Sequence, residues 1–486
     1  MKKEYSIKAQ AAYLMGGKIS SFIIRFVVPL ILVRVFSKED FGLYKQLLFV
    51  SGFFIPILKF GVAQSLFYFF PITKGKTTQL LSQTFYYFVF VGIVFLPLFH
   101  FFQMSIAGIF NNQDIIQLIN LCGLFAVFTV TSFLLEVIFI LEKRSKIVFT
   151  YVFLSELIEA AFVLWTLLVI GSIEAVFWTR IIMAMIRTLI LFMYLQVKYS
   201  ISLKIYNWDK GLIVQQAKYV LPLGMAVILR TIKNQSVKLV LAIFFTVSDF
   251  ALFAVGSLKI PLFNQFRTSI ASVARPQITK YGAQGKHDKA KALWHKQIEK
   301  FISVSAPIVV FFIVMAVPVI TLLYTEEYKE SVDIFRILLI LPLLQSLSWG
   351  TIPMAFNATK YSFQAMLIST VIGVPTAFLL IKQYGLIGAA ISSVLLFSLE
   401  VFYQIYKSKI LLKSKYTDLL PWKVFFRVLI ICLILSVPLF VISETDMHKA
   451  IKIITGAVFF FTPLLIVYHK YDIINIKQIM ADVFKK

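Results

Sequence analysis

The stretch FSKEDFGLY at residues 36–44 returns, with related residues at the same offsets, as FTVSDFALF at residues 245–253. Both copies follow a long apolar segment and place Ser or Thr, Asp-Phe, Leu and an aromatic residue in one order. A second echo comes later in each half, because PITKGK begins at Pro71 and PQITKYG begins at Pro276. Two echoes in the same order favour an internal duplication, so we expect two halves of the same architecture.

The composition is that of a membrane protein. Hydrophobic residues make up 59% of the chain and the mean hydropathy is +0.86, whereas a soluble domain averages about 45–50% apolar residues. The formal charge of +25 would suit a nucleic-acid partner only in a soluble basic domain, and no polar stretch is long enough to form one. The five histidines are scattered without metal-ligand spacing, so we expect no metal and no cofactor.

About fourteen apolar segments are long enough to cross a bilayer, which takes about 20 residues. Lys and Arg gather in alternate connections, such as EKRSK at 142–146, while the intervening ones, such as YTEEYKESVD at 324–333, are acidic or neutral. The positive-inside rule then predicts that both termini are cytoplasmic, in the inner membrane. The expected spans lie near 13–35, 41–68, 82–104, 115–140, 147–170, 175–196, 217–245, 250–272, 299–322, 333–357, 362–382, 386–406, 425–443 and 450–468.

The predicted fold is all-α and integral to the membrane, with two six-helix lobes and a trailing helix pair. An even number of spans per half relates the lobes by a pseudo-two-fold axis along the membrane normal. We expect the lobes at residues 1–210 and 211–410, and the trailing pair and tail at 411–486. In the two repeated turns, Asp40 and Asp249 are predicted to cap the helix that follows.

One basic connection, at residues 280–300, has two interpretations. Its pattern suits an interfacial helix with Trp294 toward the lipid headgroups. A charged cytoplasmic helix would show the same pattern.

Ionisable residues inside the spans are the candidates for function. Each costs about 2.5–3.5 kcal/mol at the bilayer centre, so it must face protein or water. No acidic residue occurs between residues 5 and 38 or between 210 and 248, so the cations there need an anion from a distant helix, water or a substrate. We therefore predict a basic cavity between the lobes, lined by Arg25, Arg230, Lys233, Lys18, Lys59, Lys259 and Arg267.

The competing interpretation for each cation is that its side chain snorkels to an interface. Snorkelling suits Lys18 and Arg267, which lie toward the ends of their segments, and suits the mid-segment Arg25 and Arg230 poorly. The acidic residues have a different expected role. Glu156 and Glu159 on the fifth segment are predicted to neutralise Arg180 and Arg187 on the sixth.

The chain resembles the polysaccharide-export branch of the multidrug/oligosaccharidyl-lipid/polysaccharide flippase superfamily. The resemblance covers essentially the whole chain and is carried by loose motifs in a specific order. They are GGK…RFVVPLILVRVFSKEDFGLY at 16–44, LPLG at 221–224, ARPQI at 274–278, YGLIGAA at 384–390 and LLPW at 419–422.

The resemblance implies an alternating-access flippase for a polyprenyl-diphosphate-linked oligosaccharide, used in cell-surface polysaccharide assembly. Arg25, Lys59, Arg230, Lys233 and Lys259 would meet the diphosphate, and the trailing pair would help hold the lipid tail. Partners would be this substrate, membrane lipid and other polysaccharide assembly proteins.

Two alternatives remain open. A cation-coupled multidrug exporter of the same fold would be expected to carry acidic residues in its first or seventh span, where this chain carries cations. A membrane polysaccharide polymerase would be an enzyme with a large outer loop or soluble domain, and every outer connection here is short. A non-catalytic transporter is the preferred interpretation.

Overall fold

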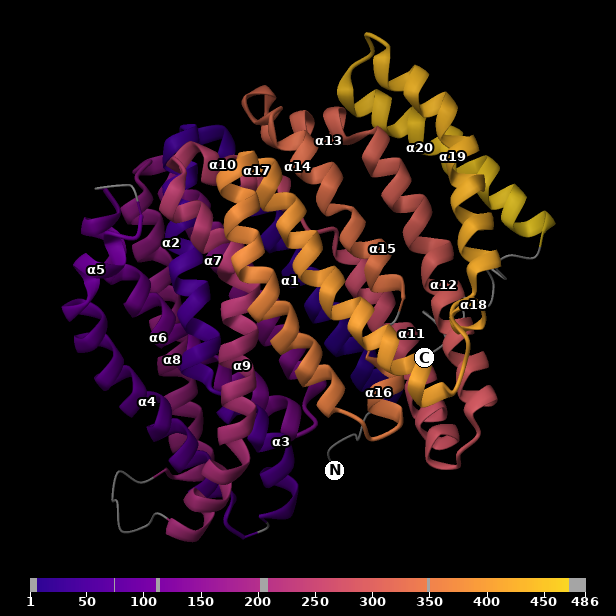
Figure 1. The fold of residues 1–486 in the computed structure, drawn as a ribbon. Coiled ribbons are helices and arrows are strands. Elements are labelled where there is room, and N and C mark those ends of the chain that lie inside the picture. The colour runs from indigo at the N-terminus through magenta and orange to yellow at the C-terminus, as the bar shows by residue number, and fades with distance from the viewer. Residues whose placement is uncertain (1–6, 74, 111–113, 202–208, 348–349, 472–486) are drawn as a thin grey trace. The chain divides into compact units, whose positions relative to one another are not determined.

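The computed structural model describes residues 7–73, 75–110, 114–201, 209–347 and 350–471, and every regular element in these ranges is helical. The chain forms two compact units, Met1–Ala251 and Leu252–Lys486. Figure 1 draws the first from indigo to magenta and the second from salmon to yellow. The lobes predicted at 1–210 and 211–410 stay a prediction, because a division into compact units does not test where a sequence repeat ends.

The first unit consists of long helices with short connections. Its helices are α1 (Ile7–Val35), α2 (Lys38–Lys59), α3 (Val62–Ile72), α4 (Thr77–Phe101), α5 (Gln103–Ala107), α6 (Asp114–Leu141), α7 (Ser145–Val169), α8 (Ile173–Tyr199), α9 (Lys210–Phe244) and the start of α10 (Val247–Gly256). The core lies where α3, α4, α6 and α8 meet, around fully buried Leu66, Leu80, Leu134 and Leu191.

The second unit contains several shorter helices. They are α11 (Pro261–Ala283), α12 (His287–Val314), α13 (Ala316–Tyr324), the 3₁₀ turn η2 (Glu326–Tyr328), α14 (Ser331–Leu338), α15 (Ile340–Ser346), α16 (Thr351–Ala355), α17 (Lys360–Leu412), α18 (Tyr416–Leu419), α19 (Trp422–Glu444) and α20 (Lys449–Lys470). The last two lie side by side (Figure 1) and pack on α12 and α13 around Phe460 and Met315. The expected trailing pair is therefore part of this unit.

Within the described ranges, 11 helices are long and apolar enough to cross a membrane. This number does not confirm the predicted fourteen spans, although one of the 11 helices contains two spans. That helix, α17, has 53 residues and a non-helical backbone at Gly385 (φ 59°). Glycine adopts positive φ without steric cost, so the chain reverses there without a separate loop. Ser369 on one arm donates to the carbonyl of Leu396 on the other, as the predicted spans 362–382 and 386–406 require.

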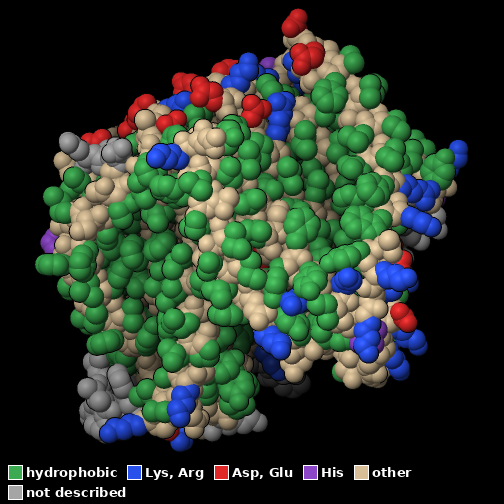
Figure 2. All heavy atoms as spheres, viewed as in Figure 1, with side chains coloured by type: hydrophobic (Ala, Val, Ile, Leu, Met, Phe, Trp, Pro, Cys, Tyr) green, Lys and Arg blue, Asp and Glu red, His purple; other side chains and the backbone are tan. Residues whose placement is uncertain are grey.

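The exposed surface is strongly apolar, as a bilayer requires. Val197, Phe101 and Leu168 are more than 70% exposed in the first unit, and Val441 is 68% exposed in the second. Figure 2 shows hydrophobic side chains over much of the visible surface. The chain is thus a multi-pass membrane protein.

The repeated turns have the same hydrogen-bonded structure, but the predicted capping residue is wrong. Ser37 and Thr246 are the N-caps, and each accepts from the backbone N–H of the Asp three residues later, Asp40 at 3.0 Å and Asp249 at 3.1 Å. In the second turn, the Asp249 carboxylate also accepts from the Thr246 backbone at 3.1 Å. This is the reciprocal capping box, in which the hydroxyl residue takes the cap and the acid sits in the first turn.

Several predicted spans are interrupted. The one expected at 250–272 breaks at residues 257–260, between α10 and α11, and that expected at 333–357 consists of α14, α15 and α16. The basic segment at 280–300 continues into α12, and its Trp294 is fully buried. The interfacial placement of this tryptophan is therefore wrong, because the ring packs in a core with Ile278 and Leu419.

Candidate functional site

An arginine–glutamate pair joins α1 to α7 in the first unit. The two helices pack closely because Gly16 and Gly17 leave room for Phe149, whose atoms lie 3.3–3.4 Å from the positions of their missing Cβ atoms. Further along these two helices, Arg25 Nε donates to Glu156 Oε2 at 3.0 Å and Arg25 Nη2 contacts Glu156 Oε1. The two parallel contacts form the bidentate geometry that guanidinium groups make with carboxylates and phosphates.

The pair is open on the side of the arginine. The Arg25 side chain is 65% exposed, whereas that of Glu156 is 10% exposed. The sequence-based pairing is therefore wrong for Glu156, whose partner is Arg25 and not an arginine of α8. The sequence required an anion for Arg25 from a distant helix, water or a substrate, and in the structure Glu156 of α7 supplies it.

The second carboxylate of α7 follows the prediction. Glu159 Oε1 accepts from Arg180 Nε at 3.1 Å, and its other oxygen contacts Arg187. Arg180 also donates to the hydroxyl of Tyr44 on α2 at 3.0 Å. These side chains are mostly buried, so the four residues join α2, α7 and α8 as a structural network.

Two lysines of α2 extend the charged region. Lys59 lies 3.5 Å from the centroid of the Phe133 ring, within electrostatic range of Arg25 and Glu136. Lys45 lies 4.8 Å from the Phe41 ring centroid, within range of Arg180. Sequence reasoning missed Lys45. Its spacing of 14 residues from Lys59 is the signal, because it places both on one face of a helix.

The break between α2 and α3 holds α9 against α2. Phe60 and Gly61 have left-handed backbones (φ 43° and 78°). A Cβ on Gly224 would lie 2.5 Å from the Phe60 ring, so the LPLG motif at 221–224 fits this break through the absence of a side chain. Gln216, also on α9, donates to the Ser65 hydroxyl of α3 at 2.9 Å.

The predicted cations of α9 differ in environment. Arg230 is exposed and makes no hydrogen bond or ion pair to any residue that the structure describes. Lys233 is 8% exposed. Arg230 is therefore available to an anion, and Lys233 is largely enclosed by protein.

Three predicted residues remain, namely Lys259, Arg267 and Lys18. Lys259 is exposed in the break before α11, and Arg267 is half-buried on α11 within range of Arg275. Both belong to the second unit. The side chain of Lys18 lies outside the described residues.

The charged cluster in the first unit contains more cations than carboxylates. Arg25 pairs with Glu156, Arg180 and Arg187 pair with Glu159, and Lys59 lies within electrostatic range of Glu136. Across the described ranges, no group of three His, Cys, Asp or Glu side chains is arranged to hold a metal ion. The chemistry that this arrangement offers is anion binding by an arginine whose present partner is a carboxylate.

Comparison with known proteins gives a family and a fold. A family profile with the description "Polysaccharide biosynthesis protein" matches residues 31–333, more than half of the chain. No curated protein sequence matches the chain.

Three solved structures share the fold at low sequence identity. A "Lipid II flippase MurJ, inward closed conformation" has a TM-score of 0.74 at 16% identity, covering 94% of this chain and 99% of that one. An inward-facing multidrug resistance MATE family transporter of the MOP superfamily has a TM-score of 0.58 at 12% identity, with coverage of 85% and 98%. A MOP superfamily transporter from Pyrococcus furiosus has a TM-score of 0.54 at 11% identity, with coverage of 83% and 95%.

Proposed function

The chain belongs to the polysaccharide biosynthesis protein family, and on that premise we propose that it is a flippase for a polyprenyl-diphosphate-linked oligosaccharide. It works by alternating access in the cytoplasmic membrane, with both termini in the cytoplasm, alongside other polysaccharide assembly proteins. The likeness to a structure titled as a lipid flippase supports this proposal through the fold. Repeated lobes at 1–210 and 211–410 would supply the two moving parts, and the segment 411–486 would contribute to holding the lipid tail.

The observation that carries the proposal is the exposed arginine of the Arg25–Glu156 pair. A diphosphate offers the same paired oxygens as a carboxylate and more negative charge, so it competes for the same guanidinium. We infer that Glu156 occupies the arginine while no substrate is bound and yields it to the diphosphate. The released carboxylate stays within electrostatic range of Arg180, which limits the cost of the exchange.

Further cations complete the proposed diphosphate site. Arg230 is the next candidate because it is exposed and makes no hydrogen bond or ion pair to a described residue. Lys59 lies within range of Arg25. The remaining members of the proposed set are Lys18, Lys233, Lys259 and Arg267.

A cation-coupled multidrug exporter of the same fold is the second candidate, favoured by the multidrug transporters among the similar structures. Such a protein needs an available carboxylate for a cation. In the described part of α1 and α9 every charged residue is basic, and Glu156 and Glu159 are both held by arginines. The balance of charge therefore favours an anionic cargo.

A charge swap tests the role of Arg25. Cells that depend on this protein for surface polysaccharide would carry the wild type, Arg25→Glu, or Arg25→Glu combined with Glu156→Arg. The double variant restores the ion pair between α1 and α7 but reverses the charge on the exposed side. Arg34→Glu, an exposed arginine near the end of α1, is the matched control.

We expect the double variant to reach the membrane at the wild-type level and still to export no polysaccharide. Arg34→Glu should export normally. Recovery of export in the double variant would show that Arg25 acts only as a structural partner of Glu156, and would contradict its role toward the diphosphate.

A further inference from the structure

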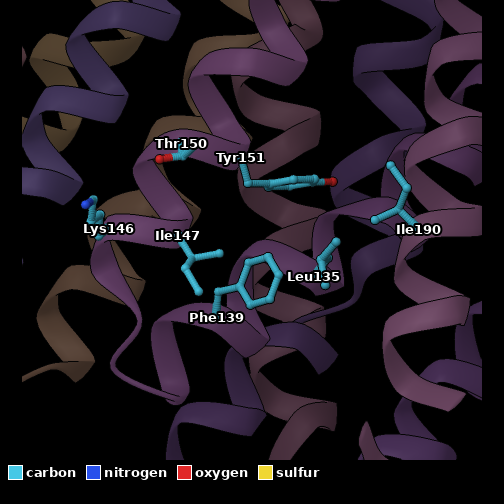
Figure 3. Close-up of a pocket in the computed structure, with 7 residues that line it drawn as sticks. All are labelled: Leu135, Phe139, Lys146, Ile147, Thr150, Tyr151 and Ile190. Atoms are coloured by element: carbon cyan, nitrogen blue, oxygen red, sulfur yellow. The ribbon is translucent and has the colours of Figure 1, made fainter. Parts of the chain in front are cut away.

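A groove in the first unit lies at the basic end of α6, α7 and α8, apart from the Arg25–Glu156 pair. Its volume is about 340 Å³. Figure 3 shows the apolar side chains of Leu135, Phe139, Ile147 and Ile190 around it, with Lys146 at one edge. Nothing in the proposed transport cycle uses this groove.

The floor of the groove is rigid. Leu135 and Phe139 are 0% and 7% exposed. The Phe139 ring packs edge-on against Tyr151 at 5.9 Å and against Tyr194 at 5.0 Å between ring centroids. Because these rings hold one another in place, the groove is preformed and does not need a ligand to open it.

The depth of the groove matches the outer part of a lipid leaflet. Its α7 residues run from Lys146, in the first turn of the helix, to Tyr151. Five residues of helix span roughly 8 Å. The groove therefore reaches from the level of the headgroups into the first part of the acyl region.

The rim carries more positive charge than its acid can balance. Glu142 accepts hydrogen bonds from Tyr194 and Tyr199 and forms ion pairs with Arg144 at 3.1 Å and with Lys198. Lys143 and Lys146 are exposed and have no ion-pair partner among the residues that the structure describes. The segment 142–146 and the end of α8 thus carry four cations and one carboxylate, an excess of positive charge that attracts an anionic headgroup.

We propose that this groove binds one anionic phospholipid of the surrounding leaflet. Its headgroup phosphate pairs with Lys146, and the upper part of an acyl chain lies along Ile147 and Phe139. A zwitterionic lipid would fill the apolar walls equally well, but the ammonium group of its headgroup would offset the phosphate charge that pairs with the lysine. The site is thus selective through charge, whereas the rest of the apolar surface takes any lipid.

Native mass spectrometry of the full-length protein tests this site. The protein would be exposed to equal amounts of phosphatidylglycerol and phosphatidylcholine with identical acyl chains. We expect wild type to retain phosphatidylglycerol preferentially, and Lys146→Glu to reduce that preference about tenfold, as reversal of one charge at the surface implies. Lys289→Glu, an exposed lysine at the start of α12, is the control and should leave the preference unchanged.

A second pair of variants tests the apolar walls. Thr150 lines the groove, whereas Leu157 is an exposed residue of the same helix outside it. Thr150→Trp should displace the retained lipid, and Leu157→Trp should not. Equal retention of both lipids by wild type, equal effects of Lys146→Glu and Lys289→Glu, or retention of a polyprenyl phosphate in place of phosphatidylglycerol would each overturn the proposal.

Discussion

Arg25 of α1 donates to Glu156 of α7 at 3.0 Å, and the two side chains differ sharply in exposure, 65% against 10%. The carboxylate is fixed within the protein while the guanidinium still has a face open to a second anion. This asymmetry suits an exchange of partners better than a permanent structural pair, because a permanent buried pair is enclosed on both sides.

Removing the charge of Glu156 should strengthen phosphate binding. With Glu156→Gln, Arg25 loses its internal anion, and we expect the Kd of purified protein for inorganic pyrophosphate to fall about tenfold, the size of one charge-assisted hydrogen bond. Isothermal titration calorimetry in detergent measures this Kd. Glu174→Gln, which changes an exposed acid at the start of α8, is the control. Unchanged affinity in Glu156→Gln would mean that the carboxylate does not compete for Arg25.

Removing the charge of Glu159 should have a different result. Its carboxylate holds both Arg180 and Arg187, and its loss leaves two largely buried cations without their anion. We expect Glu159→Gln to destabilise the protein by about 3–5 kcal/mol, seen as easier unfolding in detergent, without tighter pyrophosphate binding. Wild-type stability of Glu159→Gln would contradict a structural role for this network.

The two repeated turns contact each other in the first unit, and a substitution at this contact should move them apart. Ser248 donates to Glu39 at 2.7 Å, and a Cβ on Gly42 would lie 2.3 Å from the carbonyl oxygen of Val247. Gly42→Ala should therefore push the turns apart. Gly52→Ala is the control on the same helix, since its nearest neighbour would lie at 3.9 Å.

A disulfide between cysteines introduced at Glu39 and Ser248 measures this contact. It should form readily in the otherwise unchanged protein and in Gly52→Ala, and slowly in Gly42→Ala. Equal cross-linking in all three would show that the close approach of the turns is not needed for their contact.

Acid should destabilise the basic end of the first unit through Glu142. Burial raises the pKa of this carboxyl, but hydrogen bonds from Lys198, Tyr199 and Tyr194 outweigh it and hold the pKa below its usual range. A depressed folded pKa gives stability that is present above the unfolded value of about 4.3 and is lost as the pH falls through the folded value.

Unfolding in detergent as a function of pH checks this. Wild type should lose stability below about pH 4.3 more steeply than Glu142→Gln. Parallel pH curves for the two proteins would remove Glu142 as the source of the effect.

The sequence alone predicted the features that depend on local pattern. The apolar segments, the repeated turns and the antiparallel arms on either side of Gly385 all follow from hydropathy and residue type. The Glu159 network was also predicted, because its arginines lie on the next span and adjacent spans must pack together. The capping residue was misassigned because a hydroxyl and a carboxylate share each turn and only the backbone geometry decides between them.

The features that depend on packing between distant segments were not predictable. Glu156 and Arg25 are 131 residues apart, and an equally good partner lay closer along the chain. Trp294 lies in a basic segment typical of an interface, yet tertiary packing buries it completely. The break at residues 257–260 lies within a segment long and apolar enough to read as one span, although Pro261 follows it directly.

Translocation of a lipid-linked oligosaccharide by purified protein in proteoliposomes tests the central claim most directly. A labelled polyprenyl-diphosphate oligosaccharide on the inner leaflet would be followed to the outer leaflet with wild type, Arg25→Glu, Arg230→Glu and the control Arg34→Glu. We predict transfer with wild type and Arg34→Glu and none with the other two. Transfer at the wild-type rate in both Arg25→Glu and Arg230→Glu would contradict a cationic route for the diphosphate.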